Sequence, residues 1–190
     1  MSTINEAMKG GVVKHPAVLG TAVKMNPRDL PEGYEIGETL DGELSLVVTE
    51  VPDGYEHIGI VLCGPDGEIK EAHSLWNTVT TAGKNAIADQ LLVTPTLGKA
   101  THMAVGTGTP GGSALGSELD RNAFSSTQTR SGAVVTYFGF WAAGDGTGAI
   151  TEAGTFDASS SGNMWMSASF AVVNKLAADT LSITWTLTVS

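Results

Sequence analysis

The chain has 190 residues with 20 acidic and 10 basic side chains, which gives a formal net charge of −10. Such a surface is unsuited to nucleic acid, because phosphate contacts need clustered lysine and arginine, so we expect no nucleic acid partner. No stretch approaches the roughly 20 apolar residues that span a bilayer, so we expect no membrane partner. The length suits one ordinary domain, or a small domain with an arm.

The amino-terminal segment 1–40 differs from the rest of the chain. Glycine and proline interrupt it too often for a regular element longer than a few residues. It nevertheless carries apolar side chains, which a merely solvated tail would avoid. We therefore expect an extended arm that lies on its own domain or on a neighbouring subunit, with free disorder as the alternative. The arm residues expected at this interface are Val12, Val13, Val18, Leu19 and Val23.

Residues 41–190 are expected to form one β domain. The apolar runs at 43–51 and 57–64 predict two strands, and Asp66-Gly67 predicts a turn into a return strand over 68–79. Cys63 lies in one of these runs and cannot form an internal disulfide, because it is the only cysteine in the chain. A small buried thiol is the interpretation that its apolar neighbours favour.

One helix is predicted over residues 81–92. Ile87, Leu91 and Leu92 recur at helical spacing, so we expect all three to face the core. Thr80 or Thr81 is available as the N-cap, and Pro95 enforces a stop.

Further strands are predicted within 99–108, 131–142, 163–173 and 181–189. The last is the most regular, because apolar residues alternate with Thr184, Thr186 and Thr188. That period of two is typical of a half-buried antiparallel strand with a threonine-lined outer face. Short strands with a single helix predict a mainly β fold, an antiparallel β-sandwich with one short α-helix and an extended N-terminal arm.

Gly106-x-Gly108-x-x-Gly111 is a literal match to the dinucleotide-binding fingerprint. That site needs a helix that begins inside the motif, a βαβ unit and an acidic residue about 20 positions further on. Here Pro110 and Gly112 would break such a helix, and residues 122–133 contain no acid. We therefore expect no nucleotide cofactor, and we expect glycine to permit a tight turn at a strand end.

Other candidate sites are equally incomplete in the sequence. The glycine-rich stretch 143–149 has a single carboxylate, Asp145, which is too few for a calcium loop, so a structural turn is favoured. The four histidines have no spacing typical of a metal site, and no serine or cysteine stands in a nucleophile motif. Glu118 and Asp120 are near neighbours, but nothing in the sequence places them in a cleft. We expect no metal, no cofactor and no catalytic residue.

An ordered series of motifs resembles a family of small structural proteins of tailed bacteriophages, of the tail, collar or decoration type. The resemblance covers roughly residues 58–190 and not the arm. The motifs are W-N-x-V-x-x-A-G-K at 76–84, H-M-A-V-G-T-G-T at 102–109, A-L-G-S-E-L-x-R at 114–121, A-G-D-G-T-G-A-I-T-E-A-G-x-F-D at 143–157, V-N-K at 173–175 and D-T-L-S-I-T-W-T-L-T at 179–188. The resemblance implies a non-enzymatic accessory subunit of the virion, assembled in the host cytoplasm, and carries over no catalytic residue.

Such a subunit is expected to contact copies of itself and other virion structural proteins. By analogy with phage appendages, the expected homo-oligomer is a trimer. The four tryptophans are most simply core residues, but Trp141 and Trp165 sit beside glycine-rich loops and are the better candidates for interface anchors. Two alternatives stay open. One is a receptor- or glycan-binding module of a tail fibre, with the glycine-rich loops as its site. The other is a cell-wall hydrolase, which needs paired carboxylates across a groove.

Overall fold

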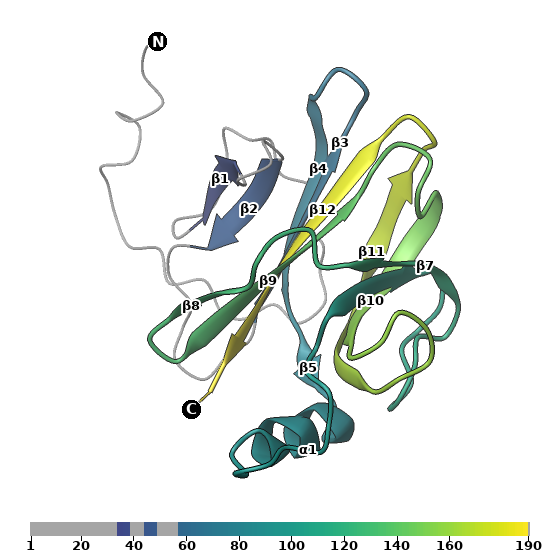
Figure 1. Cartoon of the computed structure of the whole chain (residues 1–190). Helices are drawn as coiled ribbons and strands as arrows, with labels where there is room; N and C mark the ends of the chain where they lie inside the picture. Colours follow the sequence, from purple (N-terminus) through teal and green to yellow (C-terminus); the bar gives the residue numbers. More distant parts are fainter. Residues whose placement is uncertain (1–33, 39–43, 49–56, 190) are drawn as a thin grey trace.

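The computed structural model describes residues 34–38, 44–48 and 57–189, and this part of the chain is mainly β. Two antiparallel five-stranded sheets pack face to face, with one short helix at one end of the sandwich (Figure 1). The predicted fold class, an antiparallel β-sandwich with one short helix, is confirmed.

Each sheet combines strands that lie far apart in the sequence. The strands of the first sheet are β5 (Thr78–Val79), β6 (His102–Gly106), β7 (Glu118–Ala123), β10 (Gly148–Phe156) and β11 (Met164–Lys175). Those of the second sheet are β3 (His57–Cys63), β4 (Ile69–Trp76), β8 (Thr129–Ser131), β9 (Val134–Trp141) and β12 (Thr180–Thr188). The spatial orders are β5-β11-β10-β6-β7 and β4-β3-β12-β9-β8, so β12 is central in the second sheet.

The core lies between the two sheets. Alternate residues of β12, namely Ile183, Trp185 and Leu187, point into it, as the period-two pattern predicts. The same core cluster includes Ile58, Ile60 and Leu62 of β3, Trp141 of β9, Met103 and Val105 of β6, Ile150 of β10 and Met166 of β11. Cys63 is buried, as its apolar neighbours predict.

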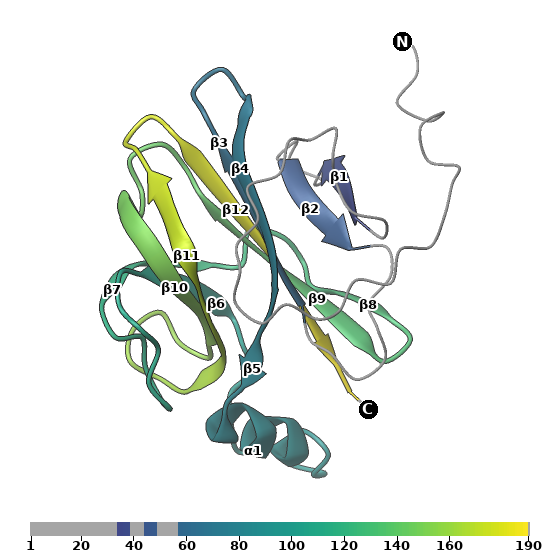
Figure 2. The ribbon, with the colours of Figure 1, turned by 180° about the vertical axis from the view of Figure 1, so that it is seen from behind.

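The expectation that the threonines of β12 line an exposed face is wrong. Thr184 and Thr186 are only 8% and 6% exposed. A third, two-stranded sheet of β1 (Tyr34–Glu38) and β2 (Leu44–Val48) lies on the side of the second sheet away from the first, and β2 contacts both β12 and β3 (Figures 1 and 2). The Thr186 hydroxyl accepts a hydrogen bond from the His57 amide at 3.1 Å, which shows how a buried hydroxyl is accommodated there.

The single helix of the described residues, α1 (Thr81–Asp89), packs against β11. Thr80 is the N-cap, since its hydroxyl oxygen accepts a hydrogen bond from the Gly83 amide at 2.9 Å. The same hydroxyl donates to the carbonyl of Met164 in β11. Gly83 permits the close contact, because a Cβ there would lie 2.8 Å from the carbonyl carbon of Trp165.

The predicted extent of the helix and two of its core residues are wrong. Ile87 packs against the core, but Leu91 and Leu92 are exposed. The helix ends at Asp89, so positions 91 and 92 no longer follow the helical period that would have turned them inward.

Most of the predicted arm, 1–40, lies outside the described residues, and so do Val12, Val13, Val18, Leu19 and Val23. Near the end of that arm, β1 pairs with β2 in a register that places Tyr34 opposite Val48. The predicted boundary at residue 40 therefore falls between two paired strands.

Replacing Thr80 with alanine should lower the free energy of unfolding by about 1–2 kcal/mol, because the N-cap acceptor of α1 is lost together with a buried hydrogen bond to β11. Urea denaturation followed by circular dichroism measures the change. The matched control is Thr81→Ala at the exposed neighbouring position, which should stay within about 0.5 kcal/mol. Equal losses in the two variants would contradict the cap.

Candidate functional site

The glycine fingerprint lies in the loop that joins β6 to β7 and folds back over the outer face of the first sheet. Glu152 stands beneath it on the neighbouring strand β10, directly opposite Gly106 in the β6–β10 register. The side chain of Glu152 is completely buried. A carboxylate in such a place must be matched by hydrogen-bond donors, because removal from water is costly.

Three backbone amides of the loop supply those donors. Oε1 of Glu152 accepts from the amides of Gly108 and Ser117 at 2.9 and 2.8 Å, and Oε2 accepts from the amide of Gly116 at 2.8 Å. Clustered amides of this kind are what a phosphate-binding loop offers to its ligand. Here the Glu152 carboxylate accepts these hydrogen bonds in place of a ligand, so the loop is clamped onto its own sheet. We call these four residues the Glu152 clamp.

The glycines of this clamp allow the loop backbone to approach the Glu152 carboxylate closely. A Cβ on Gly106 would lie 2.5 Å from Glu152 Oε1, and a Cβ on Gly108 would lie 2.8 Å from the Ser117 amide nitrogen. Neither residue has a positive φ, so the reason for glycine is space and not the turn conformation that the sequence suggested. Leu115 anchors the same loop by packing with Ala104, Phe156 and Met164 on the outer face of the sheet.

Arg121 holds a second loop on this face. Its guanidinium lies 3.6 Å from the centroid of the Phe156 ring and donates to the carbonyl oxygens of Ala158 and Ser161 at 3.0 and 2.8 Å. Two further hydrogen bonds, of 3.0 and 2.6 Å, bind it to Glu118. Glu118 is therefore engaged by an arginine on its own strand β7.

A buried lysine joins two turns at the other end of the sandwich. Nζ of Lys175 donates to the carbonyl oxygens of Ala142 and Asp179 at 2.9 and 2.7 Å. Burial lowers the pKa of Lys175, although Asp179, Asp145 and Asp120 oppose the shift. Burial would raise the pKa of Asp179, but hydrogen bonds from Lys70 and the Leu176 amide lower it below its ordinary value.

One serine–histidine pair, which the sequence did not single out, lies on the outer face of the second sheet. Nε2 of His57 and Oγ of Ser74 are 2.7 Å apart, across the paired strands β3 and β4. His57 is buried, and burial lowers its pKa to about 4, so the ring is neutral at pH 7. A neutral imidazole beside a hydroxyl is the pairing found in general-base catalysis, but it equally satisfies two polar groups under a covering hairpin.

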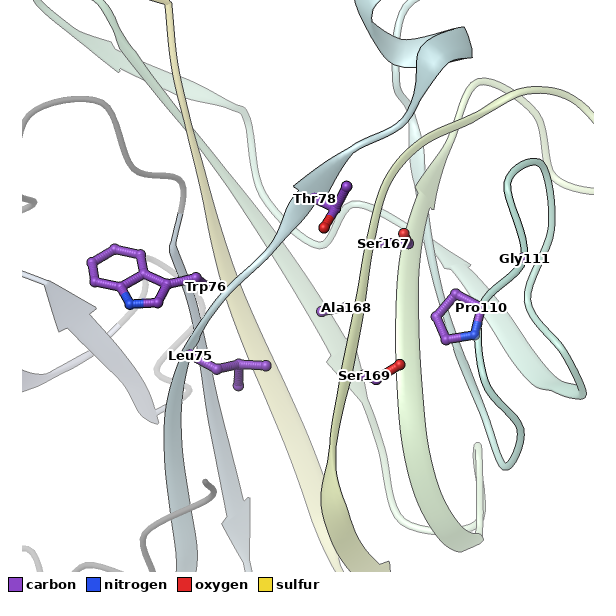
Figure 3. Close-up of a pocket in the computed structure, with 8 residues that line it drawn as sticks. All are labelled: Leu75, Trp76, Thr78, Pro110, Gly111, Ser167, Ala168 and Ser169. Atoms are coloured by element: carbon purple, nitrogen blue, oxygen red, sulfur yellow. The ribbon is translucent and has the colours of Figure 1, made fainter. Parts of the chain in front are cut away.

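A shallow recess opens between the edges of the two sheets (Figure 3). Its volume is about 490 Å³, and none of its lining side chains is charged. It is lined by Leu75, Trp76, Thr78, Pro110, Gly111, Ser167, Ala168 and Ser169. The Trp76 indole is turned away from the other lining residues and lies against the His57 ring, with 5.8 Å between the ring centroids (Figure 3). Leu75 and Ala168 are buried in the core, so the recess presents mainly the hydroxyls of Thr78, Ser167 and Ser169 beside Pro110 of the glycine-fingerprint loop.

The remaining expected site residues are not gathered around this recess. Trp141 and Trp165 are buried within the chain itself, at 0% and 4% exposure, so neither indole lies on the surface. Asp145 lies in a turn closed by a hydrogen bond from its amide to the Ala142 carbonyl, at 3.1 Å. Among the described residues, no three His, Cys, Asp or Glu side chains come together as a metal site, and no helix has the length and apolar character to cross a membrane.

No protein-family model, curated protein or solved structure matches this chain.

Replacing Glu152 with glutamine should lower the free energy of unfolding by about 3 kcal/mol, because an amide group would turn a donor toward loop amides that need acceptors. Urea denaturation measures it. Glu118→Gln is the control, since the Glu118 side chain is 35% exposed and glutamine keeps an oxygen that can accept from Arg121, so the loss should stay near 1 kcal/mol. A Glu152→Gln variant as stable as the control would show that the clamp contributes nothing.

Stability should also fall as the pH drops from about 6.5 toward 4. The unfolded chain protonates its histidines near pH 6.5, whereas folded His57 stays neutral down to about pH 4. The unfolded state therefore binds more protons in this window, which removes up to about 3 kcal/mol of stability. Denaturation curves at pH 7 and pH 4.5 test this, with His57→Asn expected to flatten the dependence. If the free energy of unfolding of that variant depends on pH as strongly as that of the wild type, groups other than His57 cause the loss.

Proposed function

We propose that this chain is a non-enzymatic structural protein of a tailed bacteriophage, an accessory subunit that connects or decorates the collar, tail or capsid. The resemblance of its motifs to such proteins supports the proposal. The observation that carries it is that these motifs supply contacts that hold loops in place. The motifs at 102–109, 114–121 and 143–157 meet in the Glu152 clamp, because they contain Gly108, Gly116, Ser117 and Glu152.

Two further motif residues act in the same way. Arg121 binds carbonyl oxygens of the loop after β10, and Lys175 binds carbonyl oxygens of two turns. These charged side chains form hydrogen bonds to the backbone and so hold the loops in one conformation. Rigid loops suit a structural subunit of an assembly, because they leave less freedom for side chains to rearrange around a substrate.

The proposed partners are copies of this chain and other virion structural proteins, with a trimer as the proposed homo-oligomer and the virion as its location. The net charge of −10 disfavours contact with packaged nucleic acid. Val12, Val13, Val18, Leu19 and Val23 are proposed to attach the subunit, because apolar side chains on an extended segment gain most by adding to the sheet edge of a partner.

The recess favours one alternative, a receptor- or glycan-binding module. The hydroxyls of Thr78, Ser167 and Ser169 are gathered there beside Pro110, and grouped hydroxyls can exchange hydrogen bonds with a sugar. Binding of the purified chain to a glycan array, lost in Ser169→Arg, would favour this alternative over a connecting role.

Deleting residues 2–33 should leave a folded, soluble chain that no longer enters the virion. The deletion stops before β1, so that β1 can still pair with β2. Mass spectrometry and immunogold labelling of purified particles, from virus encoding the full-length or the truncated chain, measure incorporation. A full-length chain missing from particles would refute the proposed function, and a truncated chain present at normal copy number would refute the role of the arm.

A further inference from the structure

One edge of the first sheet lacks the features that normally protect a sheet edge. On the side away from β10, β11 pairs with the short strand β5 at Met166 and Ser167, and no described strand pairs with it beyond these two residues. We call the remaining stretch, residues 168–174, the open edge of β11. Its sequence is ASFAVVN, which contains no charged residue and no proline. A sheet edge in this state is a template for another strand.

The other three edges of the two five-stranded sheets are protected. Strand β7 has the sequence ELDRNA, with three charged residues, and β4 carries Lys70 and Glu71. Strand β8 is only three residues long and includes Arg130. Charged side chains and short strands are common means of preventing a foreign strand from pairing. Because the open edge of β11 has neither, we interpret it as the edge that receives a strand.

The recess leaves space beside the start of the open edge. Ser167, Ala168 and Ser169 of β11 are among its lining residues, and its volume is about 490 Å³ (Figure 3). A strand that adds to a sheet is bound through its main chain, whose amide and carbonyl groups form hydrogen bonds with the edge. Such a ligand does not depend on an apolar floor, and the serine hydroxyls can meet its polar backbone.

A β-bulge shapes the far part of the open edge. Ser169 lies opposite Glu152 and Val173 lies opposite Ile150, so residues 170–172 of β11 face a single residue of β10. A bulge of this kind leaves backbone groups out of the ladder with β10. Val172, within the bulge, is 46% exposed. The open edge therefore combines unpaired backbone groups with an exposed apolar side chain.

One segment of the arm suits this edge. Residues 17–23, AVLGTAV, contain no proline and no charged residue and are long enough for an ordinary strand. We call them the donor segment. The other internal segments outside the described residues, 39–43 and 49–56, both contain acidic residues. The donor segment is therefore the uncharged strand-length stretch that this chain can offer to the open edge.

The distribution of charge favours a contact between the arm of one chain and the body of another. Residues 1–30 contain four basic and two acidic residues, whereas residues 31–190 contain six basic and eighteen acidic residues. Two complete chains repel one another, but an arm with a net charge of +2 is attracted to a body with a net charge of −12. Lys14 and Lys24 flank the donor segment and place two of these positive charges beside it.

The starting point of the arm favours the edge of a second copy over that of its own chain. Strand β1 begins at Tyr34 on the outer side of the second sheet, whereas β11 belongs to the first sheet (Figures 1 and 2). Residues 24–33 span at most about 33 Å and include Pro27 and Pro31. To reach its own β11, the arm would have to pass around the second sheet and cross two layers spaced about 10 Å apart.

We infer that the donor segment of one copy adds as a strand to the open edge of β11 in another copy. Each copy then gives one strand and receives one, either in an exchange between two copies or onward around a ring. The proposed trimer is the second case. This inference rests on the self-association and the arm within the proposed function, and not on the virion location.

Cross-linking between copies tests the contact directly. Seven chains, each with one cysteine placed within residues 17–23, are purified and mixed in turn with a Ser169→Cys chain under mild oxidation. The expected product is a disulfide-linked pair at alternate arm positions, because successive side chains of a strand point to opposite faces. Ser131→Cys replaces Ser169→Cys as the control, because Ser131 is exposed on the edge strand β8. Equally fast linkage to Ser131→Cys, or no linkage to Ser169→Cys, would overturn the inference.

A chain that carries both cysteines identifies the source of the arm. The arm position that links fastest is combined with Ser169→Cys in one chain, and the products are separated on a non-reducing gel. Disulfide-linked oligomers are expected. A monomer closed by an internal disulfide would assign the open edge to the arm of its own chain and overturn the contact between copies.

Sedimentation of the full-length chain gives an independent readout. Leu19→Pro should lower the associated fraction at least tenfold, because proline has no amide hydrogen to donate to the edge. Met8→Pro, the same kind of change outside the donor segment, should leave association unchanged. A monomeric full-length chain, or equal association of the two variants, would refute the contact even if the chain is found in particles. Association through this edge by a chain that is missing from particles would support the contact and refute the proposed function.

Discussion

The buried carboxylate of Glu152 determines the arrangement of the outer face of the first sheet. It projects from the middle of the sheet, away from the core, and is excluded from water by the loop between β6 and β7. Three amides of that loop compensate its charge, and they can reach it only because Gly106 and Gly108 lack side chains. The glycine spacing that resembles a dinucleotide site is thus explained by the space that a carboxylate needs.

Two positively charged side chains hold other loops in place by binding backbone groups of the opposite polarity. Glu152 is an anion and binds amides, whereas Arg121 and Lys175 are cations and bind carbonyl oxygens. Each partner is a backbone group in a segment that connects two strands. A hydrogen bond between a charged side chain and a buried backbone group is stronger than one at the surface, because fewer water molecules compete for it. With only 16% charged residues, the chain fixes several of its long connections with a few side chains.

Local patterns in the sequence were sufficient to predict the beginning of the helix and the strands β2 to β6, β9, β11 and β12, but not β1, β7, β8 or β10. Alternation in β12 identified Ile183 and Trp185 as core residues, and Thr80 was recognisable as a cap because its role depends on residues within one turn. The wrong predictions concern residues whose environment is set by parts of the chain that are distant in sequence. Thr184 and Thr186 lie on β12, which β2 contacts, and Asp89 at the end of the helix accepts hydrogen bonds from residues seven and eight positions later.

The polar contacts of the site were less predictable than the fold. Glu152 stands at a position where alternation only indicates an outward side chain, and its donors come from a loop more than thirty residues away. The pairing of His57 with Ser74 depends on the register between β3 and β4. Strand β7, with the polar sequence ELDRNA, lacks the apolar alternation that identifies a strand, because it is the edge of its sheet.

The central position of β12 has a consequence for synthesis of the protein. Strand β3 is translated early, but its partner on one side is β12, so Ile60 must wait for Ile183 to leave the ribosome. Until then β4 is the only strand that can pair with β3 within its sheet. Pairings between such distant segments close large loops and make folding slow. The nascent chain therefore exposes an apolar strand edge for most of its translation, and this edge is the place where a chaperone would protect it from aggregation.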